Sequence, residues 1–262
     1  MSIALQVALV MVTILVVLLV IGAPIGVAIG MSSAVSMICM IPADVSFATS
    51  AQRIFAGSNS FSLIAIPFFI LAGNIMNNGG IATRLVNCAK VISGRMPGAL
   101  AQSNVVANML FGAISGSGAA AAAAMGGTIG PLEEKEGYDK NYSTAVNVAS
   151  APVGMLIPPS NTMIVYSSVA GSVSIAALFM AGYIPGLLWG GAVMILAGIM
   201  AKKRGYQAEQ RVQVKVALKT FWQAIPSLLL IVIVIGGILG GIFTATEGSA
   251  IAVVYATVLS LI

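Results

Sequence analysis

Two short polar stretches interrupt otherwise apolar parts of this chain. The first, Ser115 to Gly118, reads Ser-Gly-Ser-Gly and is followed by six alanines. The second, Ile157 to Thr162, reads Ile-Pro-Pro-Ser-Asn-Thr and lies in the middle of the apolar run 142–169. Adjacent prolines lack backbone donors and disfavour helix, so they leave backbone carbonyls free, and glycines permit a reversal of the chain. Both stretches therefore offer carbonyl and hydroxyl oxygens inside an apolar environment.

Oxygen ligands without carboxylates suit Na⁺ better than Ca²⁺, which prefers more negative ligands. The half-helix that begins after the prolines also presents backbone amides and its positive dipole end to an anion. We therefore expect a sodium site and an anionic substrate close together. A structural role stays open for both stretches, as a turn tip and as a proline kink. The sodium-binding candidates are Ser115, Gly116, Ser117, Gly118, Ile157, Pro158, Ser160 and Asn161, and the substrate-binding candidates are Ser117, Pro159, Asn161 and Thr162.

Catalytic chemistry has little support in the sequence. The chain has no histidine, which removes Ser-His and Cys-His catalysis, and Cys39 and Cys88 are isolated. Residues 116–121 fit a dinucleotide fingerprint formally, but no strand-turn-helix unit surrounds them. We expect neither an enzyme nor an organic cofactor.

The elements that position these stretches are predicted to be membrane helices. Of the 262 residues, 59% are hydrophobic and 7% are charged, against about 25% charged in a soluble domain. No alternating ten-residue pattern indicates a membrane barrel, so we expect an all-α polytopic fold. Apolar runs that approach or exceed the length of a membrane span cover about residues 3–22, 24–42, 61–77, 142–169, 174–201 and 221–241.

The placement of basic residues predicts the topology. If residues 96–131 form a re-entrant hairpin, eleven of the twelve basic residues fall on one side, and only Arg53 lies on the other. The positive-inside rule makes that side cytoplasmic and the N-terminus periplasmic. The net charge of +5 therefore indicates topology rather than a nucleic-acid partner. The eleven are Arg84, Lys90, Arg95, Lys135, Lys140, Lys202, Lys203, Arg204, Arg211, Lys215 and Lys219.

Two polar segments are predicted to be amphipathic helices at the membrane surface. In 79–93 the apolar residues Ile81, Leu85, Cys88 and Ile92 recur at helical spacing, and 203–219 shows a weaker pattern.

Segments 20–36 and 235–252 share a helix, a glycine-rich turn and a helix start rich in small residues. This indicates an inverted repeat, a feature of secondary transporters. The apolar run at Ile262 suggests that the second repeat is truncated.

Remaining polar residues have ordinary interpretations. Thr244 to Glu247 reads as a capping box. Asn104, Asn108 and Asn147 are expected to make helix-packing hydrogen bonds. The acidic residues of 133–139 are expected to form a solvated cytoplasmic loop.

Several motifs, in order, make the chain resemble the large membrane (M) subunit of tripartite ATP-independent periplasmic (TRAP) transporters. The resemblance covers essentially all residues and is most specific at Ile66–Gly73, which is followed by Asn-Asn-Gly-Gly, and at Gly112–Ala119, Ile157–Asn161 and Thr244–Ala250. It implies a sodium-driven importer of organic anions in the bacterial inner membrane. The implied partners are a small membrane (Q) subunit and a periplasmic substrate-binding (P) protein.

The resemblance also implies an elevator fold of the ion-transporter superfamily, with a transport domain that slides against a scaffold. Ser115 to Gly118 would be the hairpin tip, and Ile157 to Asn161 the break that shares a sodium site with it. The family's second hairpin and second broken helix are not found in this chain. An ion channel or membrane scaffold with purely structural breaks is the alternative. Substrate identity stays open among dicarboxylates, sialic acid and related acids. The expected parts are scaffold helices at 1–78, an arm helix at 79–95, a transport domain at 96–201, a cytoplasmic arm helix at 202–219, and the start of the second-repeat scaffold at 220–262. Within the transport domain we expect the hairpin at 96–131, the broken helix at 142–169 and a further helix at 174–201.

Overall fold

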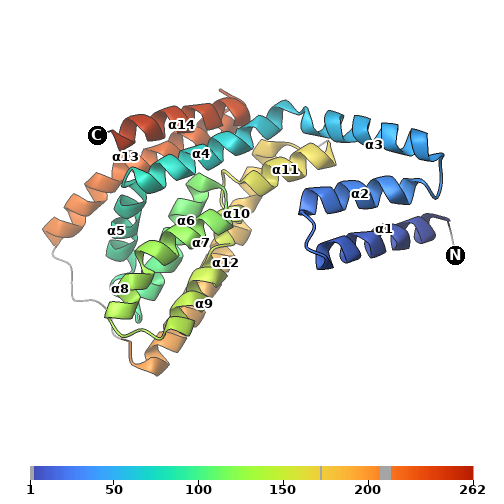
Figure 1. The fold of residues 1–262 in the computed structure, drawn as a ribbon. Helices are drawn as coiled ribbons and strands as arrows, with labels where there is room; N and C mark the ends of the chain where they lie inside the picture. The colour runs from blue at the N-terminus through green and yellow to red at the C-terminus, as the bar shows by residue number, and fades with distance from the viewer. Residues whose placement is uncertain (1–2, 172, 207–213, 262) are drawn as a thin grey trace. The chain divides into compact units, whose positions relative to one another are not determined.

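The computed structural model describes residues 3–171, 173–206 and 214–261, and every regular element in these ranges is a helix (Figure 1). The chain divides into two compact units, Met1–Ser60 and Phe61–Ile262. In the first unit, helix α1 (Ile3–Val20) packs against α2 (Ile25–Met37), and α2 packs against α3 (Ala43–Ser58). None of the residues of α1 is buried, although all but Gln6 and Thr13 are apolar. Such an exposed apolar surface suits contact with lipid.

The second unit places a helical hairpin among longer helices. In Figure 1, α6 and α7 lie near its middle, with α9 and α12 beside them, and α4 and α14 run side by side at one end. The elements of this unit are a 3-10 turn (Phe61–Ile64), α4 (Ala65–Asn78), α5 (Ile81–Ser93), α6 (Ala99–Ser115), α7 (Gly118–Thr128), α8 (Gly130–Lys135), α9 (Lys140–Ser150), α10 (Val153–Leu156), α11 (Asn161–Ala170), α12 (Ile175–Arg204), α13 (Val214–Leu239) and α14 (Ala245–Ser260).

Four helical stretches in the described ranges are long and apolar enough to cross a membrane: 3–20, 61–78, 175–204 and 215–239. A fifth candidate is the bent pair 140–156 and 161–170, whose parts meet at 48°. Five of the six expected apolar runs thus correspond to candidate spans. The sixth, 24–42, does not, because its helix α2 has 13 residues. At 1.5 Å per residue that helix is about 20 Å long, which is shorter than the hydrocarbon core.

The amphipathic segment at 79–93 forms α5, which packs against both α6 and α13. Three of its four expected apolar-face residues, Ile81, Leu85 and Cys88, are buried, but Ile92 is 53% exposed. Val86 and Ala89 complete the buried face of α5, and Ile92 is not part of it.

The segment 202–219 is not one separate helix in the described residues. Its first three residues end α12, and residues 214–219 begin α13. Residues 207–213, including Arg211, lie outside the described residues. An arm helix with the predicted bounds is therefore not what the structure shows.

The two glycine-rich segments each contain a helix, a turn and a second helix. Gly22 follows α1 with φ of 86°, and Gly241 follows α13 with φ of 67°. Both values lie in the left-handed region, which glycine adopts without a steric cost. The capping box expected at the start of α14 is present, since Thr244 and Glu247 exchange hydrogen bonds.

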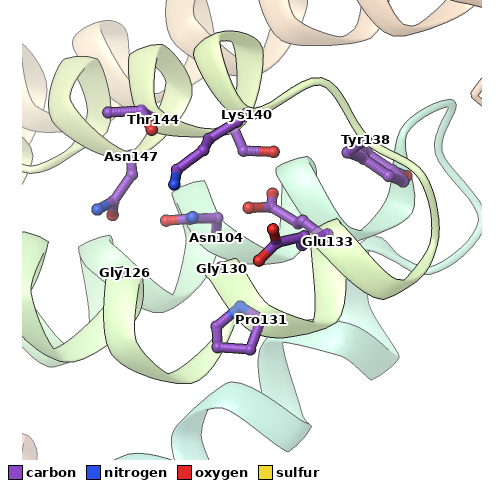
Figure 2. Close-up of a pocket in the computed structure, with 11 residues that line it drawn as sticks. Asn104, Gly126, Gly130, Pro131, Glu133, Tyr138, Lys140, Thr144 and Asn147 are labelled. Carbon is purple, nitrogen blue, oxygen red and sulfur yellow. The ribbon is translucent and has the colours of Figure 1, made fainter.

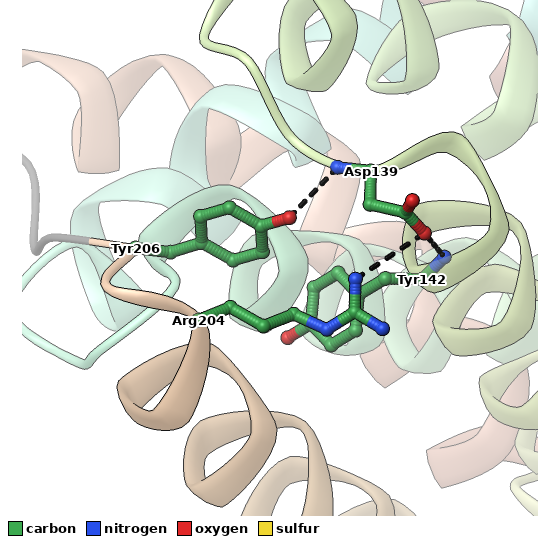
Figure 3. A network of polar contacts seen from close by, with 4 residues as sticks. All are labelled: Asp139, Tyr142, Arg204 and Tyr206. Carbon is green, nitrogen blue, oxygen red and sulfur yellow. Dashed lines mark hydrogen bonds and ion pairs between the residues drawn. The ribbon is translucent and has the colours of Figure 1, made fainter.

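The C-terminal end of α12 is fastened to the start of α9 (Figure 3). Arg204 Nη1 lies 3.3 Å from Asp139 Oδ1, and the guanidinium sits 5.4 Å from the ring centroid of Tyr142. The Asp139 amide donates to the Tyr206 hydroxyl at 2.8 Å, and the Tyr142 hydroxyl donates to the carbonyl of Ala197 at 2.8 Å. These contacts fix the end of α12 beside the hairpin and the broken helix.

Candidate functional site

The first polar stretch forms the tip of a hairpin between α6 and α7. Gly116 adopts φ of 61° and donates its amide to the carbonyl of Gly112 at 2.8 Å, which ends α6. Ser117 caps the next helix, because its Oγ accepts from the amide of Ala120 at 3.3 Å. Helix α7 has 11 residues and is therefore about 17 Å long, too short to cross the membrane alone.

The second polar stretch separates α10 from α11. Ile157 and Ser160 are extended, and the peptide bond between Pro158 and Pro159 is cis. Ser160 is fully buried, and its Oγ accepts from the amide of Met163 at 3.4 Å. The second half-helix therefore begins with a capped N-terminus directly after the two prolines.

The hairpin tip and the helix break contact each other directly. The backbone amide of Asn161 donates to the carbonyl of Gly116 at 3.3 Å. The Asn161 side-chain amide donates to the carbonyl of Ser115, also at 3.3 Å. A Cβ on Gly116 would lie 2.9 Å from the carbonyl oxygen of Pro159, so this approach requires a glycine. Residues 46 positions apart thus meet with their backbone oxygens close together.

Below the tip, glycines bring the two elements into backbone contact. A Cβ on Gly112 of α6 would lie 2.3 Å from the Cα of Gly154 in α10. A Cβ on Gly118 of α7 would lie 3.0 Å from the carbonyl oxygen of Ala151. Real Cβ atoms essentially never come as close as 2.3 Å to another atom and seldom as close as 3.0 Å, so the position of the break relative to the tip depends on these glycines, above all on Gly112.

The predicted site residues fall into three groups. Ser115, Gly116, Pro159 and Asn161 meet at the contact, and the Oδ1 of Asn161 is buried there without a hydrogen-bond partner. Such an oxygen is available to a cation. Thr162, in contrast, is exposed on α11. Residues that cap or shape the contact without joining it directly are Ser117, Gly118, Ile157, Pro158 and Ser160.

A buried polar cluster joins α6 to α9, about two to three turns of α6 from the hairpin tip. The Nδ2 of Asn108 lies 2.8 Å from Asn104 Oδ1, 3.0 Å from Asn147 Oδ1 and 2.8 Å from Ser150 Oγ. The Nδ2 of Asn147 donates to the carbonyl of Ala122 at 2.9 Å. The expected packing role of the three asparagines agrees with these contacts. Ser150 was missed, because a single serine in an apolar run carries no distinguishing pattern.

Glu133 does not lie in a solvated loop. It belongs to α8 and is only 1% exposed, whereas its neighbours Glu134 and Lys135 are exposed. The prediction was wrong here because α8 continues directly from α7 and turns one side toward α6 and α9. The proline at the start of this short helix was the only local indication.

Within the described ranges, no three His, Cys, Asp or Glu side chains are grouped so that they could hold a metal ion. Any cation at the tip would therefore be bound by carbonyl, hydroxyl and amide oxygens. This donor set fits Na⁺ better than a transition metal, which prefers imidazole or thiolate ligands.

Comparison with known proteins identifies the family. Residues 12–262 match the family described as tripartite ATP-independent periplasmic transporter, DctM component. This chain belongs to that family. It is therefore part of a multi-pass membrane permease rather than of an enzyme.

Three relatives illustrate the match. The chain is 54% identical over 231 residues to the uncharacterized protein YgiK of Salmonella typhimurium, covering 88% of this chain and 53% of that protein. It is 43% identical over 210 residues to the isethionate TRAP transporter permease protein DctMQ of Oleidesulfovibrio alaskensis, covering 80% and 33%. It is 40% identical over 217 residues to the sialic acid TRAP transporter large permease protein SiaM of Vibrio cholerae, covering 81% and 50%. The DctM-family chain thus spans about half the length, or less, of these curated relatives.

Proposed function

We propose that the permease containing this chain is a sodium-coupled secondary transporter that imports organic anions by an elevator mechanism. The observation that carries the proposal is the contact between tip and break. Asn161 binds two tip carbonyls through its backbone and side-chain amides and keeps one buried oxygen free. A cation at this point would draw the oxygens of the tip and of the break together, and so couple its binding to their packing.

In the proposed coupling, Na⁺ and the substrate anion bind next to each other, so that their opposite charges attract. A Na⁺ ion would be held by Ser115, Gly116, Ser117 and Gly118 of the tip together with Ile157, Pro158, Ser160 and Asn161 of the break. The N-terminus of α11 would then present backbone amides to the substrate anion, beside Ser117, Pro159, Asn161 and Thr162. Binding of the cation would lower the electrostatic cost of holding the anion.

The proposed partners follow from the family and its relatives. One relative is named DctMQ, which supports a small Q subunit beside the M chain. We also propose delivery by a periplasmic P protein, a location in the bacterial inner membrane, and a periplasmic N-terminus, in keeping with the basic residues on the opposite side. The named relatives concern isethionate and sialic acid. Both are organic acids, so an organic acid is the proposed substrate class.

In this proposal the hairpin and the bent pair belong to the moving transport domain, and α5 acts as an arm between it and the scaffold. The scaffold comprises residues 1–78 and begins again at 220–262.

Uptake by proteoliposomes tests the proposal. The intact permease, with its Q subunit and P protein, is assayed with and without a sodium gradient. Asn161→Ala is expected to raise the sodium concentration for half-maximal uptake by up to about tenfold, since the loss of a hydrogen bond costs about 0.5–1.5 kcal/mol and about 1.4 kcal/mol corresponds to a factor of ten. Ser117→Ala should act in the same direction.

Ser168→Ala is the matched control. Its hydroxyl donates to the carbonyl of Ile164 one turn earlier on the same helix, α11, away from the break. It should leave the sodium dependence unchanged. If uptake ignores sodium, or if Asn161→Ala folds and responds to sodium as the wild type does, the breaks are structural and the channel or scaffold alternative is favoured.

A further inference from the structure

A cavity of about 330 Å³ lies beside α6, α8 and α9, away from the hairpin tip (Figure 2). Asn104 from α6, Glu133 from α8 and Lys140 from α9 line it together. Glu134 and Thr144, both exposed, also line it. The cavity therefore connects the surface to the buried side of α8, at the end of the hairpin predicted to face the cytoplasm.

Among the described residues, the Glu133 carboxyl has no cationic partner within ion-pair distance, and the polar side chains beside it are neutral. The residue is 1% exposed, and both of its carboxyl oxygens are buried without a hydrogen bond of good geometry. The side chains of Asn104 and Ser143 lie beside it and favour its charged form through hydrogen bonding, but their effect is smaller than that of burial. Burial destabilises the ionised form of this carboxyl, because it removes water from the carboxylate and no ion pair replaces the lost hydration.

Pairing with a cationic side chain does not remove that cost. Among the described residues, the ion pair found is between Arg204 and Asp139, and none joins Glu133 to Lys140 although both line the same cavity. The remaining way to remove the buried charge is a proton, which water in the cavity can deliver.

We propose that Glu133 is a proton-binding site, whose buried carboxylate takes a proton from a hydronium ion in the water of this cavity. One O–H bond forms on the carboxyl and one O–H bond of the hydronium ion breaks, which leaves a neutral water molecule in the cavity. The site goes beyond the proposed sodium coupling, since it shares no residue with the tip or the break. The permease would then bind a proton as well as sodium, at the place where the hairpin leads into the broken helix.

The charged groups around the carboxyl agree with this. Glu134 from α8 is a like charge at the cavity, Lys140 from α9 is an opposite one, and Tyr138 and Tyr142 add phenol groups. The cavity residues from α6 and α7, Asn104 and Gly126, carry no charge. Burial raises the pKa of Glu133 to about 7, against a smaller lowering by Ser143 and Asn104.

The pH dependence has a definite sign. The native state holds the Glu133 proton up to about pH 7, whereas the unfolded chain releases it near 4.5. Stability is therefore full below 4.5 and falls as the pH rises to about 7, because the folded state binds more protons in that window. For these two values the unfolding equilibrium constant rises about 30-fold between about pH 5.5 and about pH 8.

The experiment compares wild type, Glu133→Gln and Glu134→Gln of the intact permease in lipid nanodiscs or mixed micelles. Glutamine has the shape of a neutral carboxylic acid, so Glu133→Gln should fold and lose this 30-fold component of the pH dependence. Glu134→Gln removes the same charge from an exposed neighbour at the same cavity. This variant should keep the 30-fold component of the pH dependence. If wild type and Glu133→Gln share one pH dependence, the proposal is wrong.

Infrared difference spectroscopy adds a readout that needs neither unfolding nor transport. The carbonyl band of a protonated carboxyl should appear as the pH is lowered through neutrality in the wild type and in Glu134→Gln, and should be absent in Glu133→Gln. If Glu133→Gln does not fold, the spectra of the wild type and Glu134→Gln decide. A band that titrates near neutral pH in both supports the site, and its absence overturns it.

Discussion

Replacement of Gly112 by alanine tests whether backbone contact between α6 and α10 holds the candidate ion site together. The added Cβ would lie 2.3 Å from the Cα of Gly154 and 3.1 Å from its backbone nitrogen. Carbon atoms in good contact are about 3.5–4.0 Å apart, so the helices must separate by more than about 1 Å. Both obstructing atoms belong to the backbone, so the clash can be removed only if the helix backbones themselves move apart.

Overpacking of this kind costs about 1–3 kcal/mol. Gly112→Ala is expected near the upper end of that range, measured as the free energy of unfolding of the intact permease in mixed micelles. Because the separation would also pull the tip from the break, the sodium concentration for half-maximal uptake should rise in the same variant.

Gly127→Ala is the matched control on the same hairpin. A Cβ there meets nothing within 4 Å, and the position lies in α7, so the better helix propensity of alanine should leave stability equal or higher by up to about 1 kcal/mol. A Gly112→Ala variant that is as stable as Gly127→Ala would refute the argument that this close approach is required.

Three further substitutions address other contacts. Ser160→Ala removes the N-cap of α11 and should lower the free energy of unfolding by about 0.5–2 kcal/mol; equal stability would mean that the cap is replaced. Asn108→Leu leaves the polar groups that face it, including Ser150, buried without partners. It should lower the free energy of unfolding by about 1–3 kcal/mol or more. An unchanged free energy of unfolding would show that water replaces the amide. Arg204→Ala should lower the melting temperature only slightly, and less in high salt, because its ion pair with Asp139 is exposed; a large, salt-independent loss would contradict that interpretation.

The sequence predicted the helical class, most candidate spans and the location of both helix interruptions. These follow from local chemistry, because apolar length sets a span and adjacent prolines or glycines break a helix wherever they occur. The capping box at Thr244 acts within one turn of its own position, so a short sequence pattern suffices to find it. The motifs, taken in their order along the chain, are specific enough to indicate the family by themselves.

Other features were decided only by packing between distant parts of the chain. The contact of Asn161 with Ser115 and Gly116 joins residues that the sequence separates by more than forty positions. The burial of Glu133 depends on how α8 lies against α6 and α9, so an acidic segment that looked solvated contains one inaccessible carboxyl. The sequence by itself thus determined which segments are helical and where they break, because those are properties of neighbouring residues. Only the tertiary structure decided which free oxygens meet and which charge is buried, because both depend on the approach of helices remote in sequence.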